Sequence, residues 1–173
     1  LAEAAERFPG ASILDLGGGL GVVERPGQRA LDLDAVNESL ALFREAYPRF
    51  SLWLEPGRFL VARAGALLAR VTQIKHKGDR TFVGVETGMN SLIRPALYGA
   101  WHQIVNLTRL DEPPTQVADI VGPICESGDV LGNSRRIAPA QEGDVLLVAT
   151  GGAYGYAMSS RYNLREPAEE VLL

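Results

Sequence analysis

The chain has 173 residues, of which 46% are hydrophobic and 22% charged, a balance typical of a globular protein. Its net charge of −4 argues against a nucleic-acid partner, because phosphate binding normally requires a basic surface. No apolar run approaches the ~20 residues of a membrane helix, and a single cysteine excludes an intrachain disulfide. We therefore expect a soluble cytoplasmic protein. Because the sequence does not start with methionine, we also expect it to be cut from a longer chain.

The first third of the chain alternates predicted helices and strands. The sequence LAEAAERF reads as the end of an amphipathic helix, and the short apolar strand of residues 12–16 follows it. Asp34 is the predicted N-cap of the next helix, which Pro48 ends. One face of that helix carries apolar side chains at spacings of four, three and four, namely Val36, Leu40, Phe43 and Tyr47.

A second strand, residues 50–54, comes next and ends in the sequence EPGR, residues 55–58. A strand, a helix and a strand joined by short connections predict a βαβ unit with parallel strands. Beyond about Val71 the runs TFVGVE, HQIVNL, QVADIVG and DVLLVAT are short, β-rich and separated by Gly, Pro and Asp. This second part predicts an antiparallel β domain. The last residues, PAEEVLL, read as a strand that is not finished, and KHKGD around His76 reads as a solvated turn.

Five stretches contain residues that could support chemistry, and each also has a structural reading. Gly17, Gly18 and Gly19 follow a strand, where bare backbone can approach a phosphate or simply make a tight turn. The EPGR and GMNSLIRPALY stretches offer a carboxylate, guanidinium groups and a hydroxyl, or ordinary ion pairs and packing. GPICESGD holds the only cysteine, in a loop, and GAYGYAMSS holds two tyrosines that bind a ligand or pack. His102 reads as a core histidine, and we assign it no role.

The order of these stretches resembles the diaminopimelate decarboxylases, within the alanine-racemase-like, fold type III enzymes that use pyridoxal phosphate. The resemblance covers residues 13–173, and ICESGD and IRPALY are its most specific parts. It implies an α/β plus β fold: residues 1–70 would be the last βα units of a (β/α)8 barrel, and residues 71–173 the C-terminal antiparallel β domain. It also implies a homodimer whose active sites are shared between subunits, and decarboxylation of meso-diaminopimelate to L-lysine.

The resemblance also implies roles for individual residues. The cofactor would be bound by Gly17, Gly18, Gly19, Glu55, Gly57, Arg58 and Tyr154, with Glu55 facing the pyridine nitrogen. The amino-acid substrate would be bound by Arg58, Arg94, Tyr98, Glu126 and Tyr154, with Glu126 on its distal ammonium. Cys125 would be the acid that returns a proton to Cα, a role that suits a thiol because an unperturbed thiol is mostly protonated at neutral pH. No metal is implied.

The sequence departs from the family pattern in two places. The lysine that forms the Schiff base with the cofactor lies early in the family's barrel, and Lys75 and Lys77, the only lysines here, do not match its motif. We therefore expect the isolated chain to be inactive. Glu86 and Thr87 stand where the family usually has Asp-Ala, and this leaves the role of Glu86 open. A decarboxylase of ornithine, arginine or carboxynorspermidine type, a non-catalytic homologue and, from the glycine loop alone, a methyltransferase are the alternatives.

Overall fold

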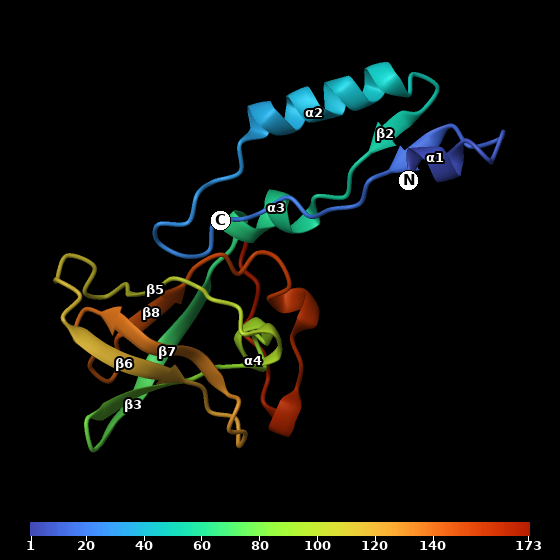
Figure 1. The fold of residues 1–173 in the computed structure, drawn as a ribbon. Helices are drawn as coiled ribbons and strands as arrows, with labels where there is room; N and C mark the ends of the chain where they lie inside the picture. The colour runs from blue at the N-terminus through green and yellow to red at the C-terminus, as the bar shows by residue number, and fades with distance from the viewer. The chain divides into compact units, whose positions relative to one another are not determined.

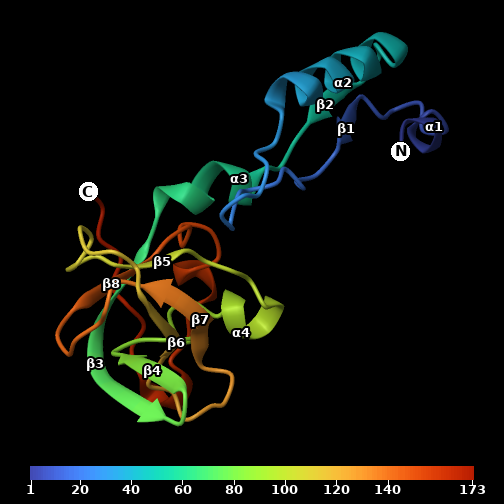
Figure 2. The ribbon, with the colours of Figure 1, turned by 60° about the vertical axis from the view of Figure 1, so that its left-hand side comes forward.

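The computed structural model describes all residues from Leu1 to Leu173, which divide into two compact units. Unit 1 comprises residues 1–23 and 27–60, and unit 2 comprises residues 24–26 and 61–173. Both units are drawn in Figure 1 and Figure 2. No helix is both long enough and apolar enough to cross a membrane.

Unit 1 contains the predicted βαβ arrangement. After α1 (Ala2–Ala5), β1 (Ile13–Asp15) and β2 (Ser51–Trp53) form a two-stranded parallel sheet, and α2 (Leu33–Ala46) lies between them in the sequence. The pairing aligns Leu14 with Leu52, so both strands end at the same edge. This edge carries the glycine loop after β1 and the EPGR turn after β2, and α3 (Gly57–Val61) begins within that turn.

The predicted N-cap of α2 is wrong by two residues. Asp32, which has an extended backbone, accepts a hydrogen bond from the backbone N–H of Ala35 at 3.0 Å, while Asp34 lies inside the first turn. An N-cap side chain reaches the N–H two or three residues further on, and only Asp32 has this geometry here. The far end of the helix packs as predicted, because Phe43 and Tyr47 contact a small core of Ala2, Ala5, Leu14 and Phe50.

Unit 2 is built on a six-stranded sheet in the order β5-β8-β3-β4-β6-β7. Its strands are β3 (Leu67–Lys77), β4 (Arg80–Val85), β5 (Ile104–Asn106), β6 (Gln116–Val121), β7 (Val130–Ile137) and β8 (Val145–Val148). The sheet curls so that the edge strands β5 and β7 approach each other, which nearly closes a barrel (Figure 1). The α/β plus β class is therefore confirmed. The sheet is mixed rather than purely antiparallel, because β4 and β6 pair in parallel.

Two further readings of the sequence are corrected in unit 2. His76 lies inside β3, and the turn comes later, at Gly78, whose positive φ of 57° suits glycine. Residues 165–173 contain no strand, so PAEEVLL is not a strand. The remaining short elements are α4 (Arg94–Tyr98) and the 3-10 turns at Ala62–Ala64, Tyr156–Met158 and Tyr162–Leu164.

The core of unit 2 fills the inside of the curled sheet. Its buried members are mainly β-branched and small residues from β3 to β8, namely Ala69, Val71, Val83, Val85, Leu92, Ile104, Ala118, Ile120, Leu131, Ile137, Ala140, Leu146 and Val148. Burying such side chains is worth about 1.5–3 kcal/mol for each large aliphatic residue. This core gives unit 2 a rigid frame from which the loops at the sheet's ends project.

Candidate active site

The glycine loop after β1 is held by its own strand. The carboxylate of Asp15 accepts a hydrogen bond from the N–H of Gly17 at 2.8 Å. Gly17 and Gly19 have φ values of 70° and 88°, in the left-handed region where a residue with a Cβ is strained. The glycines are therefore required by the path of the backbone, and the loop presents main-chain groups without side chains.

The loop packs directly against the EPGR turn within unit 1. The N–H of Glu55 donates to the carbonyl of Gly17 at 2.8 Å, and a Cβ on Gly18 would lie 2.8 Å from the carbonyl oxygen of Glu55. Gly57 N–H bonds back to the same oxygen at 2.8 Å. The side chain of Glu55 is exposed, and Arg58, on α3, is half-buried. The structure thus brings Gly17, Gly18, Gly19, Glu55 and Gly57 together at one edge of the parallel sheet.

The cysteine loop lies in unit 2, between β6 and β7. Gly122 N–H donates to the carbonyl of Asp129 at 3.0 Å, which closes the loop at its base. Cys125 at its tip is exposed and unpaired, as the sequence predicts. Gly128 lies against Ala96, so this loop and α4 are neighbours.

Glu126 is exposed, and its carboxylate is surrounded by hydrogen-bond donors. Its Oε1 accepts from the Ser127 hydroxyl at 3.1 Å and from Gly128 N–H at 3.3 Å, while Oε2 accepts from the Tyr162 hydroxyl at 3.4 Å. The Gly128 N–H contributes most to lowering the pKa of Glu126, followed by the Ser127 hydroxyl. The side chain is therefore a carboxylate at neutral pH, as binding a substrate ammonium requires.

Helix α4 carries two of the predicted substrate-binding residues, with very different exposure. Tyr98 is 64% exposed, whereas Arg94 is 7% exposed. Arg94 Nη2 forms an ion pair with Glu24 at 3.1 Å, and its Nη1 donates to His102 Nε2 at 3.2 Å. Pro95 occupies the first turn, where its missing N–H costs nothing, and the left-handed Gly99 ends the helix. The guanidinium is thus held in a fixed orientation.

His102 is a core histidine, as the sequence predicts, but its contact with Arg94 was not foreseen. It is fully buried, and its Nδ1 donates to the carbonyl of Ala149 at 2.9 Å, so Nε2 is the acceptor for Arg94. Burial lowers the pKa of His102, and the nearby positive charge of Arg94 lowers it too. A neutral imidazole is the form that can accept from Arg94. The hydrogen bond from His102 to Ala149 depends on how β5 and β8 pair with each other, so no spacing in the sequence reveals it.

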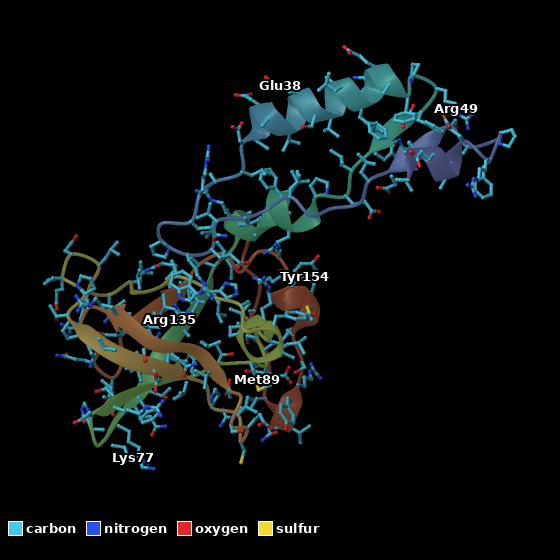
Figure 3. All side chains as sticks on the ribbon, viewed as in Figure 1. Glu38, Arg49, Lys77, Met89, Arg135 and Tyr154 are labelled. Atoms are coloured by element: carbon cyan, nitrogen blue, oxygen red, sulfur yellow. The ribbon has the colours of Figure 1, made fainter.

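The tyrosine loop after β8 is a tightly packed turn. A Cβ on Gly65 would lie 2.7 Å from the Cα of Gly152, and one on Gly152 would collide with the carbonyl of Val61. Tyr154, labelled in Figure 3, has a φ of 60°, which is unusual for a residue with a Cβ, and the residue is 49% exposed. The glycines here are therefore explained by backbone packing, and the turn directs the Tyr154 ring towards solvent.

The two lysines lie on the β3–β4 hairpin, with Lys77 at its tip (Figure 3). Neither is on a loop that carries a predicted site residue. Glu86 has a structural contact, because its Oε1 accepts from the N–H of Arg70 at 2.9 Å beside the β3–β4 pairing. No cluster of His, Cys, Asp or Glu that could hold a metal ion is present.

Comparison with known families gives a match over most of the chain. The model for the pyridoxal-dependent decarboxylase, C-terminal sheet domain, matches residues 21–152. The chain belongs to the pyridoxal-dependent decarboxylase family. Two curated relatives named diaminopimelate decarboxylase, from Neisseria meningitidis serogroup B and Pseudomonas aeruginosa, are each 48% identical and cover 92% of this chain. The chain spans 38% of the length of each of these relatives.

Solved structures of this decarboxylase family have the same fold. A diaminopimelate decarboxylase of Helicobacter pylori complexed with L-lysine has a TM-score of 0.81 at 32% identity, covering 94% of this chain and 40% of its own. One from M. jannaschii has a TM-score of 0.84 at 36% identity, covering 96% and 39%. A lysine decarboxylase from Selenomonas ruminantium has a TM-score of 0.81 at 26% identity, covering 96% and 43%.

The residues of unit 1 fit the pyridoxal phosphate that this family uses. A phosphate needs N–H donors that it can approach closely, and three consecutive glycines at the end of a parallel strand provide such backbone. The contact between Gly18 and the Glu55 carbonyl fixes this loop relative to an exposed carboxylate. A pyridine nitrogen requires such a carboxylate if it is to remain protonated.

Proposed function

We propose that the complete protein to which this chain belongs decarboxylates meso-diaminopimelate to L-lysine, with pyridoxal phosphate as cofactor. The observation that carries the proposal is the exposed Cys125–Glu126 loop beside α4, which bears Arg94 and Tyr98. Together these residues offer an acid, a carboxylate for an ammonium group and two donors for a carboxylate. The relatives named diaminopimelate decarboxylase, at 40–48% identity, support the same choice.

The residues of unit 1 serve the cofactor in this proposal, together with Tyr154 from unit 2. Gly17, Gly18, Gly19 and Gly57 hold its phosphate: Gly18 and Gly19 offer their backbone N–H groups, while Gly17 and Gly57, whose N–H groups donate to Asp15 and to the Glu55 carbonyl, shape the turns beside it. When bound, the cofactor supplies an electron sink for the electron pair left by departing CO2. Glu55 keeps a proton on the ring nitrogen, and Arg58, three residues further along the chain, binds both cofactor and substrate.

In this proposal the residues of unit 2 recognise the substrate. Diaminopimelate carries an ammonium and a carboxylate at its far end, so its recognition requires both charges. Glu126, a carboxylate with a lowered pKa, binds that ammonium. Arg94 and Tyr98 bind the carboxylate, since a guanidinium held by Glu24 and His102 presents its remaining N–H groups in a fixed direction. Tyr154 adds a directed hydroxyl.

Cys125 returns the proton to Cα after CO2 leaves. General acid catalysis needs a protonated donor within hydrogen-bond reach of the accepting atom, and an exposed thiol at a loop tip can supply one. We propose that this loop serves the active site of a partner subunit in a homodimer. We also propose that residues 1–70 complete a barrel begun earlier in the parent protein, that residues 71–173 form its C-terminal domain, and that the enzyme is cytoplasmic, where a lone thiol stays reduced.

A decarboxylase for another basic amino acid is the second candidate, and the fold shared with the lysine decarboxylase favours it. The experiment is to assay CO2 release by the complete protein with meso-diaminopimelate, lysine, ornithine and arginine. Release from diaminopimelate alone, at least 100-fold faster than from the others, supports the proposal. Preference for lysine or ornithine would assign the second function, and no release with cofactor bound would indicate a non-catalytic homologue.

A further inference from the structure

Asp129 is a buried carboxylate that has no role in the proposed decarboxylation. It ends the cysteine loop immediately before β7, and only 3% of it is exposed. No lysine, arginine or histidine forms an ion pair with it. A buried charge without an ion-pair partner is costly unless hydrogen bonds satisfy it. The donors around it therefore show what this carboxylate does.

Both oxygens of Asp129 accept backbone hydrogen bonds from two different segments. Oδ2 accepts from Ile124 N–H at 2.7 Å, and Oδ1 accepts from Met89 N–H at 2.6 Å. Ile124 directly precedes Cys125, and Met89 belongs to the segment that leads into α4. The side chain of Asp129 thus joins the loop that carries Cys125 to the segment that precedes Arg94 in the chain. Met89 and Asp129 are 40 residues apart in sequence.

Two glycines make room for this carboxylate. A Cβ atom on Gly88 or on Gly122 would collide with the carboxyl group of Asp129. Neither glycine has a positive φ, so the reason for glycine is the space taken by Asp129 and not the backbone conformation. The two chain segments therefore pass as close to the side chain as backbone can.

We propose that Asp129 is a positioning residue, which fixes the Cys125–Glu126 loop against the segment before α4. It touches neither substrate nor cofactor and acts through the two side chains at the loop tip. An aspartate suits this place because it offers an acceptor on each side, whereas an asparagine would offer one acceptor and turn its NH2 group towards the other N–H. This inference rests on the proposed function for its kinetic consequence but not for the contacts themselves.

The test compares Asp129→Asn with Asp119→Asn in the complete protein. Asp119 is a matched control, since it is also a buried aspartate of unit 2 that accepts from a backbone N–H, that of Ser134 at 2.7 Å, but it lies on β6 and contacts Arg80 instead of the loop. For Asp129→Asn we expect kcat for diaminopimelate to fall about tenfold or more and KM to rise, while cofactor occupancy stays at the wild-type level. For Asp119→Asn we expect wild-type kcat and KM.

Two readouts do not depend on activity. Amide hydrogen exchange at Ile124 and Met89 should accelerate in Asp129→Asn, and iodoacetamide should alkylate Cys125 several times faster, as measured by peptide mass. Gly122→Ala should have the same effects, because the new Cβ would collide with the Asp129 carboxylate. Unchanged exchange and alkylation in both variants would overturn the positioning role, as would equal kinetic loss in Asp119→Asn. If the wild-type protein did not decarboxylate diaminopimelate, the proposed function would fail while exchange and alkylation still tested Asp129.

Discussion

The backbone of Gly18 lies so close to Glu55 that a Cβ atom on Gly18 would sit 2.8 Å from the carbonyl oxygen of Glu55. This contact joins the glycine loop to the turn that carries the carboxylate assigned to the pyridine ring. Because the neighbouring atom is backbone, it has little freedom to move away. The distance between the two halves of the proposed cofactor site therefore depends on a glycine at this position.

Replacing Gly18 with alanine in the complete protein should weaken cofactor binding. We expect the loop or the turn to shift by several tenths of an ångström and the Kd for pyridoxal phosphate to rise about tenfold, measured by absorbance titration of the apoenzyme. Gly21→Ala is the control, since nothing lies within 4 Å of its Cβ position and its φ is not positive. Equal affinities in the two variants would show that the Gly18 contact does not shape the cofactor site.

Replacing Glu126 with glutamine should impair substrate recognition and leave cofactor binding intact. A hydrogen bond between charged groups is worth about 1.5–3 kcal/mol, so KM for diaminopimelate should rise by roughly one to two orders of magnitude. Glu142→Gln, at an exposed turn before β8, should change neither constant. Loss of cofactor together with an unchanged KM would refute the role of Glu126.

Protonation of His102 should destabilise the folded protein. Burial lowers the pKa of His102, so the unfolded chain takes up this proton first, at its ordinary pKa of about 6.5. The folded state therefore loses stability as the pH falls below about 6.5, by at most about 1.4 kcal/mol per pH unit, and the loss ends below the folded-state pKa. His102→Gln keeps one donor and one acceptor but does not titrate, so its thermal midpoint should fall less between pH 7 and pH 5.

The chain has only two histidines, and this gives the experiment its control. His76→Gln changes an exposed side chain on β3 whose Nδ1 contacts the Thr81 hydroxyl. It should leave the acid-dependent loss of stability as in the wild type. If His76→Gln removed the pH dependence, or His102→Gln kept it in full, the neutral form of His102 would not be what holds Arg94.

Local patterns in the sequence predict those helices and strands whose apolar residues recur at helical or strand spacing. The helix face through Phe43 and the strands β1, β2, β4, β5, β6 and β8 follow from apolar spacing alone. β3 was missed, and its end was taken for a turn because Lys75, His76 and Lys77 give it a polar character. β7 was missed as well. The parallel pairing of β4 with β6 was missed too, since pairing depends on contacts distant in sequence.

The same limit applies to the candidate site. An exposed cysteine in a Gly/Pro loop is visible in the sequence because its neighbours are local. The partners of Asp129 and Arg94 are not, since Met89 is 40 residues away from the first and Glu24 is 70 residues away from the second. Gly88 lies three residues after β4 and Gly122 directly after β6, and nothing in the sequence around either glycine indicates the carboxylate that fills the space beside it.

The proposed sharing of Cys125 between subunits leads to a test by complementation. A Cys125→Ala subunit keeps an intact cofactor site, and a subunit lacking the cofactor-binding lysine keeps an intact Cys125 loop. Each homodimer should be nearly inactive. Mixed dimers should regain activity, because one of their two sites combines an intact lysine with an intact Cys125. The reason is that a proton donor must lie within hydrogen-bond reach of the accepting carbon, so only the correctly paired site can turn over.

The two inactive variants are dissociated, reassociated together and assayed for CO2 release. Random exchange of equal amounts makes half of the dimers mixed, and with one competent site each they should recover about a quarter of the wild-type rate. Subunit exchange is verified by native mass spectrometry, with the two variants carrying tags of different mass. Absence of recovery in a sample that has exchanged would mean either that the Cys125 loop serves its own subunit or that this thiol is not the proton donor. A double variant that lacks both the lysine and Cys125 gives an independent check, because on exchange with wild-type protein it lowers the rate per wild-type subunit only when the loop crosses the interface.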